Sequence, residues 1–147
     1  MPHNHEWQAR IKDVEREYWA IRQATDRFQE QVRRDPTILE GDLRYKDIIH
    51  AAENLDGTYI IRLFAEFETG LRQYWDQMRG TNPRTRDLLV SLAAICRIPD
   101  EQHDRVHEVR EYRNTLVHER EGEVDPIPVG KSRGYLCHFF SFLPPQW

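Results

Sequence analysis

Apolar side chains recur at alternating steps of four and three along the first quarter of the chain. The series predicts one long helix with a single apolar stripe that ends before Pro36; its members are Trp7, Ile11, Val14, Tyr18, Ile21, Thr25, Phe28 and Val32. Such a stripe is typical of a helix that packs along another helix. The partner helix can belong to an intramolecular bundle or to a dimerising coiled coil. The further helices predicted below favour the bundle.

Two more amphipathic segments follow this helix. Thr37 and Glu40 have the spacing of a capping box, which predicts a second helix through about residue 53. Asp56 can cap a third helix, and Gly80 is suited to end it. The apolar side of the third predicted helix consists of Ile60, Leu63, Phe64, Phe67, Leu71, Tyr74, Trp75 and Met78.

The second half of the chain contains two further helix signals. Asn82-Pro83 predicts the start of a fourth helix that runs through Ile95. The break at Ile98-Pro99 is followed by Asp100, which can cap a fifth helix that reaches about residue 120.

The whole chain is predicted to form one all-α domain, because 147 residues suffice for a single buried core. We expect a bundle of about five helices with its core at about residues 7–120. Residues 121–134 are predicted to form a loop rich in Gly and Pro. The apolar segment at residues 135–143 can form a short helix or an extended arm, so that residues 121–147 form a C-terminal loop and Pro-rich arm.

The net charge of −4 excludes a generally basic nucleic-acid coat, so any RNA contact must be a local patch. The chain has 18 Arg and only 3 Lys, which suits phosphate binding but also fits an Arg-rich genome. Cys96 and Cys137 have no metal-binding spacing, and we expect a reduced, cytoplasmic protein. The sequence contains no apolar run of the kind that would predict a signal peptide or a membrane span. The sequence predicts no cofactor and no metal site.

An arginine followed five or six residues later by a histidine occurs four times, so the spacing alone selects no site. The four pairs are Arg44–His50, Arg97–His103, Arg113–His118 and Arg133–His138. Only Arg113 is directly followed by a small polar residue, Asn114, and only its pair lies in the last turns of a long predicted helix. These two features alone assign no function to Arg113, Asn114 and His118.

Helical geometry separates the fifth predicted helix into two faces. The polar stripe contains His107, Glu111, Asn114 and His118, with His103 beside it and Arg110 at its boundary; the apolar arc contains Val106, Val109, Tyr112, Leu116 and Val117. Arg113 lies within the apolar arc and requires a partner, because an unpaired buried charge is costly. Glu68 on the third predicted helix is the candidate. A plain structural ion pair and a solvated helix face are the alternatives to a functional site. His103 and His107 form a weak candidate metal pair, since no third ligand follows beyond Glu111.

The segment Arg113-Asn114-x3-His118 resembles the R-x4-6-H motif of the HEPN superfamily, small all-helical domains that include many ribonuclease toxins. The superfamily prefers a small polar residue directly after the arginine and places the motif in the last turns of a long helix, so the resemblance selects Arg113, Asn114 and His118 among the four pairs. The resemblance implies a metal-independent endoribonuclease that acts on RNA, a toxin or defence effector with a composite site at a homodimer cleft. It also implies that His118 acts as general acid or base, that Arg113 stabilises phosphate charge and that Asn114 orients the phosphate or His118. Supporting roles fall to Glu68, Arg110, Glu111, Tyr112 and His107, where Tyr112 either stacks on a base or belongs to the core.

Some HEPN domains are not catalytic. The alternative is therefore a helical module that binds a partner protein or RNA through the same cleft. A third reading is a helical dimer of unrelated purpose in which the motif is fortuitous. An antitoxin or another regulatory protein is a further expected partner for the ribonuclease.

Overall fold

The computed structural model describes residues 3–118 and 124–147, and this part of the chain is all-α. Its elements are α1 (Asn4–Arg34), the short 3-10 helix η1 (Pro36–Ile38), α2 (Tyr45–Met78), α3 (Thr85–Ile95), α4 (Asp100–Val117) and α5 (Val129–Ser141). The predicted fold class and the predicted number of helices are confirmed. None of the helices in the described ranges is both long and apolar enough to cross a bilayer.

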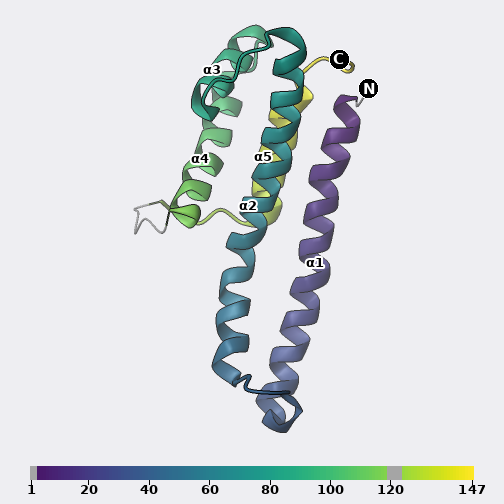
Figure 1. The fold of residues 1–147 in the computed structure, drawn as a ribbon, viewed down its shortest axis with the longest axis vertical. Coiled ribbons are helices and arrows are strands. Elements are labelled where there is room, and N and C mark those ends of the chain that lie inside the picture. The colour runs from purple at the N-terminus through teal and green to yellow at the C-terminus, as the bar shows by residue number, and fades with distance from the viewer. Residues whose placement is uncertain (1–2, 119–123) are drawn as a thin grey trace.

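Helices α1 and α2 form a long antiparallel hairpin, and the remaining helices pack on its upper half (Figure 1). Helix α5 contacts both α1 and α2, and α4 contacts α2 and α5, while α3 packs on α4 and the end of α2. The two ends of the described chain meet: the backbone N–H of Asn4 donates to the carbonyl of Pro145 at 3.0 Å. The Asn4 amide also donates to the carbonyls of Phe140 and Leu143.

The predicted second and third helices are one continuous helix, α2. Thr37 does not start α2 but lies in η1. There its backbone N–H donates a hydrogen bond to the side chain of Asp35. Helix α2 starts at Tyr45, and the carboxylate of Asp47 accepts the backbone N–H of Arg44 at 2.9 Å. Asp56 lies in the middle of α2 and caps nothing. Its carboxylate instead accepts hydrogen bonds from α1, which explains a polar residue at that position.

Other predicted boundaries differ by a few residues. Gly80, with φ +64°, follows the end of α2 as predicted. Helix α3 starts at Thr85, two residues after Pro83. Asp100 is the first residue of α4 and not its N-cap as predicted; the N-cap is Pro99, which makes no side-chain capping hydrogen bond.

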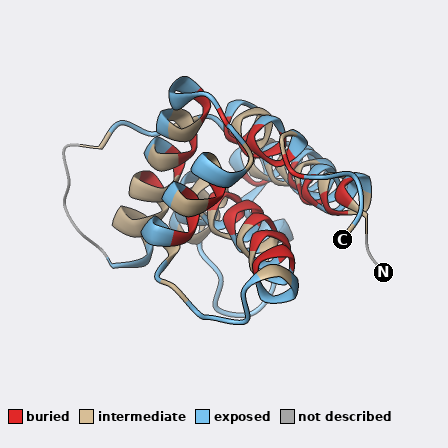
Figure 2. Cartoon of the chain, turned by 90° about the horizontal axis from the view of Figure 1, so that it is seen from above, coloured by how far each residue is buried: buried red, intermediate tan, exposed pale blue. Residues whose placement is uncertain are grey.

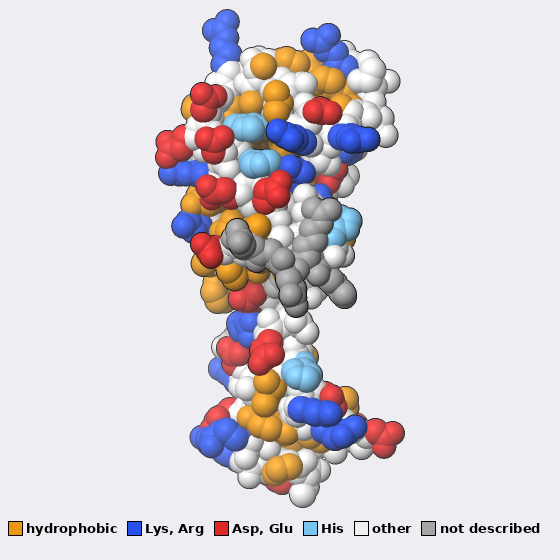
Figure 3. All heavy atoms as spheres, turned by 90° about the vertical axis from the view of Figure 1, so that its left-hand side faces the viewer, with side chains coloured by type: hydrophobic (Ala, Val, Ile, Leu, Met, Phe, Trp, Pro, Cys, Tyr) orange, Lys and Arg blue, Asp and Glu red, His pale blue; other side chains and the backbone are white. Residues whose placement is uncertain are grey.

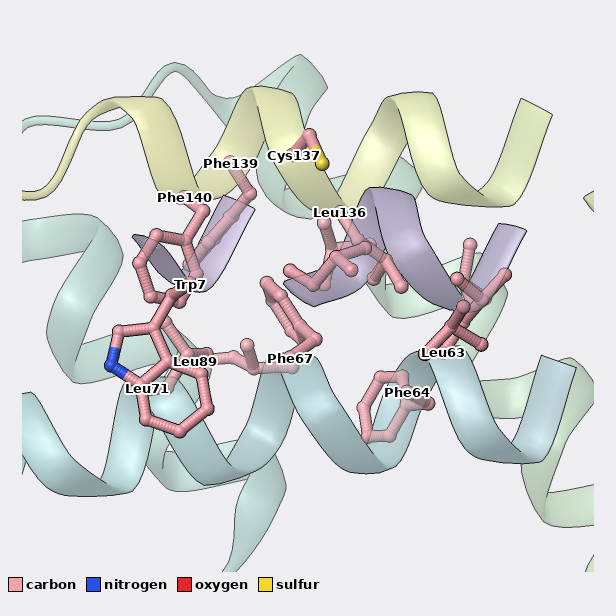
Figure 4. Packing of buried hydrophobic residues seen from close by; sticks show 14 of the residues in the cluster. Trp7, Leu63, Phe64, Phe67, Leu71, Leu89, Leu136, Cys137, Phe139 and Phe140 are labelled. Atoms are coloured by element: carbon pink, nitrogen blue, oxygen red, sulfur yellow. The ribbon is translucent and has the colours of Figure 1, made fainter. Parts of the chain in front are cut away.

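The C-terminal segment is a helix that belongs to the core, so the predicted core at residues 7–120 was too short. Helix α5 begins at Val129, inside the segment predicted to be a loop. Leu136, Phe139 and Phe140 are completely buried, and both Phe rings lie within 6.3 Å of the Phe67 ring (Figure 4). The buried faces of the helices point toward one another around this cluster (Figure 2).

Candidate functional site

Arg113 occupies the side of α4 that faces α2. Its guanidinium lies over the ring of Phe64, 4.6 Å from the ring centre, and its Nη2 lies 3.6 Å from Oε2 of Glu68. The predicted Arg113–Glu68 pair is therefore present. Burial lowers the pKa of Arg113 and Glu68 opposes that effect, and an arginine remains cationic at neutral pH.

Glu68 is itself held in place by one residue of its own helix and by one residue of α3. Its Oε1 accepts hydrogen bonds from Arg72 at 2.8 and 3.0 Å and from the Thr85 hydroxyl at 2.7 Å. Arg72 also donates to the carbonyl of Pro83, which precedes α3. The network joins α2, α3 and α4 and leaves Oε2 directed to Arg113. The sequence reasoning missed Arg72 and Thr85, although Arg72 follows Glu68 by four residues, a spacing typical of helical ion pairs.

His118 lies at the C-terminal end of α4, exposed to solvent. Its backbone N–H donates to the carbonyl of Asn114 at 3.0 Å, and the Asn114 side chain is half-buried. Five residues of helix separate Arg113 from His118, which corresponds to about 7.5 Å along the axis and about 140° around it. The two side chains therefore leave α4 in different directions, and a single copy does not aim both at one point.

A small pocket of about 140 Å³ opens beside Arg113. It is lined by Ile61, Phe64, Ala65, Glu68, Arg113 and Val117. Val117 is 45% exposed although it is apolar, and on the helix it falls between Arg113 and Asn114. The surface next to the motif is thus partly apolar and has a charged group at its edge.

The polar stripe of α4 is held together by Arg110. The Nη2 of Arg110 donates to Glu111 at 2.8 Å and lies 3.5 Å from Nδ1 of His107, and His107 lies 3.7 Å from Glu111. Burial, followed by the charge of Arg110, lowers the pKa of His107, so its imidazole is neutral at pH 7. The rings of His103 and His107 stack at 6.3 Å.

Tyr112 belongs to the core, where it is 8% exposed, and is not placed to stack on a base. Of the other arginine–histidine pairs, Arg133–His138 lies on α5 and not in the predicted loop, and Arg133 pairs with Glu15 at 2.6 Å. His50 is exposed on α2, far along the chain from the α4 network.

The side of the polar stripe that faces away from Arg113 is acidic. A larger cleft of about 500 Å³ lies there, between α4 and the segment that leads into α5; it is lined by His107, Glu108, Glu111, Val124, Asp125, Pro126, Ile127, Pro128 and Lys131. In the described ranges, no three His, Cys, Asp or Glu side chains are grouped to hold a metal ion. No protein-family model, curated protein or solved structure matches the chain.

Proposed function

We propose that the protein is a metal-independent endoribonuclease of the HEPN type, a toxin or defence effector, with an active site shared between two copies. The observation that carries the proposal is the state of Arg113. It is a half-buried cation whose partner carboxylate is already engaged by Arg72 and Thr85. A guanidinium held in this way is pre-organised to stabilise charge on a phosphate.

The divergence of Arg113 and His118 on α4 supports a composite site. In a two-fold dimer each residue of one copy can face the other residue of its partner. The exposed Val117 lies between the two positions and would be covered in such an interface. His118 would take the proton of the ribose 2′-OH and return a proton to the leaving 5′-oxygen. The products would be a 2′,3′-cyclic phosphate and a 5′-hydroxyl.

The test is cleavage of RNA in EDTA by the wild type, His118→Ala and a matched control, His50→Ala, which removes an exposed histidine of another arginine–histidine pair. We expect His118→Ala to lower the rate about 10²- to 10⁴-fold and His50→Ala to leave it unchanged. Equal rates for the wild type and His118→Ala would exclude His118 as the catalytic group. Failure of the wild type to cut any RNA would favour the alternative function, a non-catalytic module that binds a partner protein or RNA.

Mixing two inactive variants tests the shared site. Arg113→Gln and His118→Ala are each expected to be inactive, but their heterodimer contains one site with both native groups. Random exchange makes half of the dimers heterodimers with one intact site of two, so about a quarter of the wild-type activity should return. No recovery on mixing, with exchange verified by mass, would place both groups in the same copy.

A further inference from the structure

Along α4, two arginines and three carboxylates lie on opposite sides of the line of histidines His103, His107 and His118. On the side of α2 and α3 lie Arg110 and Arg113, and on the other side lie exposed or half-buried carboxylates, those of Asp104, Glu108 and Glu111. Figure 3 views this face and shows the histidines with mostly acidic side chains on one flank and mostly Arg and Lys on the other. The sorting gives a polyanion only one direction of approach.

Arg86 of α3 extends the arginine side. It lies one turn before Val90, and Val90 lines a groove of about 250 Å³ together with Asp100 and His103 of α4. The same face of α3 therefore directs Arg86 toward α4, and its charge contributes to lowering the pKa of His107. Arg86 is exposed, and in the described ranges no carboxylate lies within ion-pair distance of it.

The local charge on this side is positive although the chain is acidic. In the part of the chain that the structure describes, Glu68 and Glu111 are the only carboxylates that pair with Arg72, Arg110 or Arg113, and Arg86 pairs with none. The charge of Arg86 acts on His107, and His107 is six residues from Arg113, about 9 Å along α4. That separation is too long for one phosphate and suits a neighbouring phosphate of the same strand.

We propose that single-stranded RNA runs from the Arg113 site along the α3 side of α4, and that Arg86 binds a phosphate next to the one held by Arg113. This inference rests on the proposed function, since it takes RNA as the ligand. The acidic side of α4, with Glu108, is excluded from the path by repulsion. Arg86 is a positioning residue and takes no part in proton transfer.

The experiment measures binding without cleavage. A fluorescent single-stranded RNA is titrated with His118→Ala protein in EDTA over a series of salt concentrations, and Arg86→Gln is added to that background. Loss of one phosphate contact should reduce the slope of log affinity against log salt by about 0.7, equivalent to about a fivefold loss of affinity at 0.1 M salt. The loss should be similar for RNAs of different sequence, because a phosphate carries no sequence information.

Two control variants in the same background make the result specific. Arg27→Gln removes the same charge from an exposed position in the lower half of α1, and Glu108→Gln removes a charge from the acidic side of α4. Both should change affinity less than twofold. An Arg86→Gln effect no larger than that of Arg27→Gln overturns the path, and so does an increase of affinity in Glu108→Gln that exceeds the loss in Arg86→Gln.

The outcomes separate this inference from the proposed function. If the wild type does not cut RNA but binding depends on Arg86, the ribonuclease proposal fails and the RNA path stands. If the wild type cuts RNA and binding is indifferent to Arg86, the path fails and the ribonuclease proposal stands. If His118→Ala protein binds no RNA at all, the path is overturned, whatever the cleavage assay reports.

Discussion

The upper and lower halves of the α1–α2 hairpin follow one sequence pattern but differ in burial. On the same apolar stripe of α1, Ile11 is completely buried whereas Ile21 is 41% exposed. The cause is the length of α5, whose 13 residues span about 20 Å while the 31 residues of α1 span about 46 Å. Near the start of α5, Arg133 pairs with Glu15, so α5 ends its contact with α1 near Glu15 (Figure 1).

The difference teaches what a periodic pattern specifies. The pattern identifies the face of a helix that is apolar, but the number of helices that cover this face decides how deeply it is buried. The upper half has a three-helix contact and a core of large aromatic residues. In the described part of the chain, the lower half consists of α1, α2 and the short η1; its stripe residues Ile21 and Phe28 remain exposed, whereas Val32, near η1, is buried. We therefore expect the two halves to respond differently to the same substitution.

The largest contrast is expected for two phenylalanines. Phe139→Ala removes a completely buried ring from the upper half and should lower the free energy of unfolding by about 3–5 kcal/mol. Phe28→Ala removes a ring that is 38% exposed from the lower half and should cost less than about 1 kcal/mol. Urea unfolding followed by circular dichroism measures both. Equal losses would mean that the lower half is covered in solution, for example by a second copy.

Replacing each of two glycines by alanine should change the stability in opposite directions. A Cβ at Gly70 would lie 2.8–2.9 Å from atoms of Phe140 and Trp7, so Gly70→Ala should destabilise the upper half by about 1–3 kcal/mol. Gly134 lies within α5, where a Cβ would meet nothing within 4 Å. Gly134→Ala should stabilise the protein by about 0.5–1 kcal/mol, because alanine favours the helix. The midpoints of thermal unfolding should move in opposite directions, and a gain from Gly70→Ala would contradict the close packing.

The features that could be predicted from the sequence are those that depend on neighbouring residues or on the direction in which a residue leaves its helix. The fold class follows from helical spacing, and the Arg113–Glu68 pair follows from two positions that each point toward a neighbouring helix. The division of α2 at Asp56 was wrong because a polar residue before Gly57 resembles a helix start. Here Asp56 instead contacts α1, and Gly57 allows Leu116 of α4 to approach, since a Cβ there would meet Leu116 at 3.0 Å.

The role of α5 was not predictable from local patterns. Gly130 and Gly134 lower its helix propensity, and tertiary packing, above all that of Phe139 and Phe140 against Phe67 of α2, offsets that cost. The same holds at the site: the hydrogen bond of the Thr85 hydroxyl to Glu68 joins α3 to α2, and a one-dimensional pattern does not specify such a contact. The direction of His118 relative to Arg113 was predictable from the helical repeat. Which residue of a second copy His118 would face in a dimer is not predictable in this way.

The smallest effect concerns the boundary between the two halves, where Tyr18 and Arg22 of α1 each donate to the Asp56 carboxylate at 2.6 Å. Partial burial alone would raise the pKa of Asp56, but these hydrogen bonds and the Arg22 charge outweigh it, and the pKa lies below its ordinary value of 3.8. A lowered pKa in the folded state means that the contribution to stability is present above pH 3.8 and is lost as the pH falls through the folded pKa. Because the side chain is 47% exposed, the contribution should be on the order of 0.5 kcal/mol. Urea unfolding from pH 7 to pH 2.5 should show a constant deficit for Asp56→Asn above pH 3.8 that shrinks below it. A deficit that grows on acidification would show that the pKa of Asp56 is raised in the folded protein and that its ionised form is the less favourable one at this boundary.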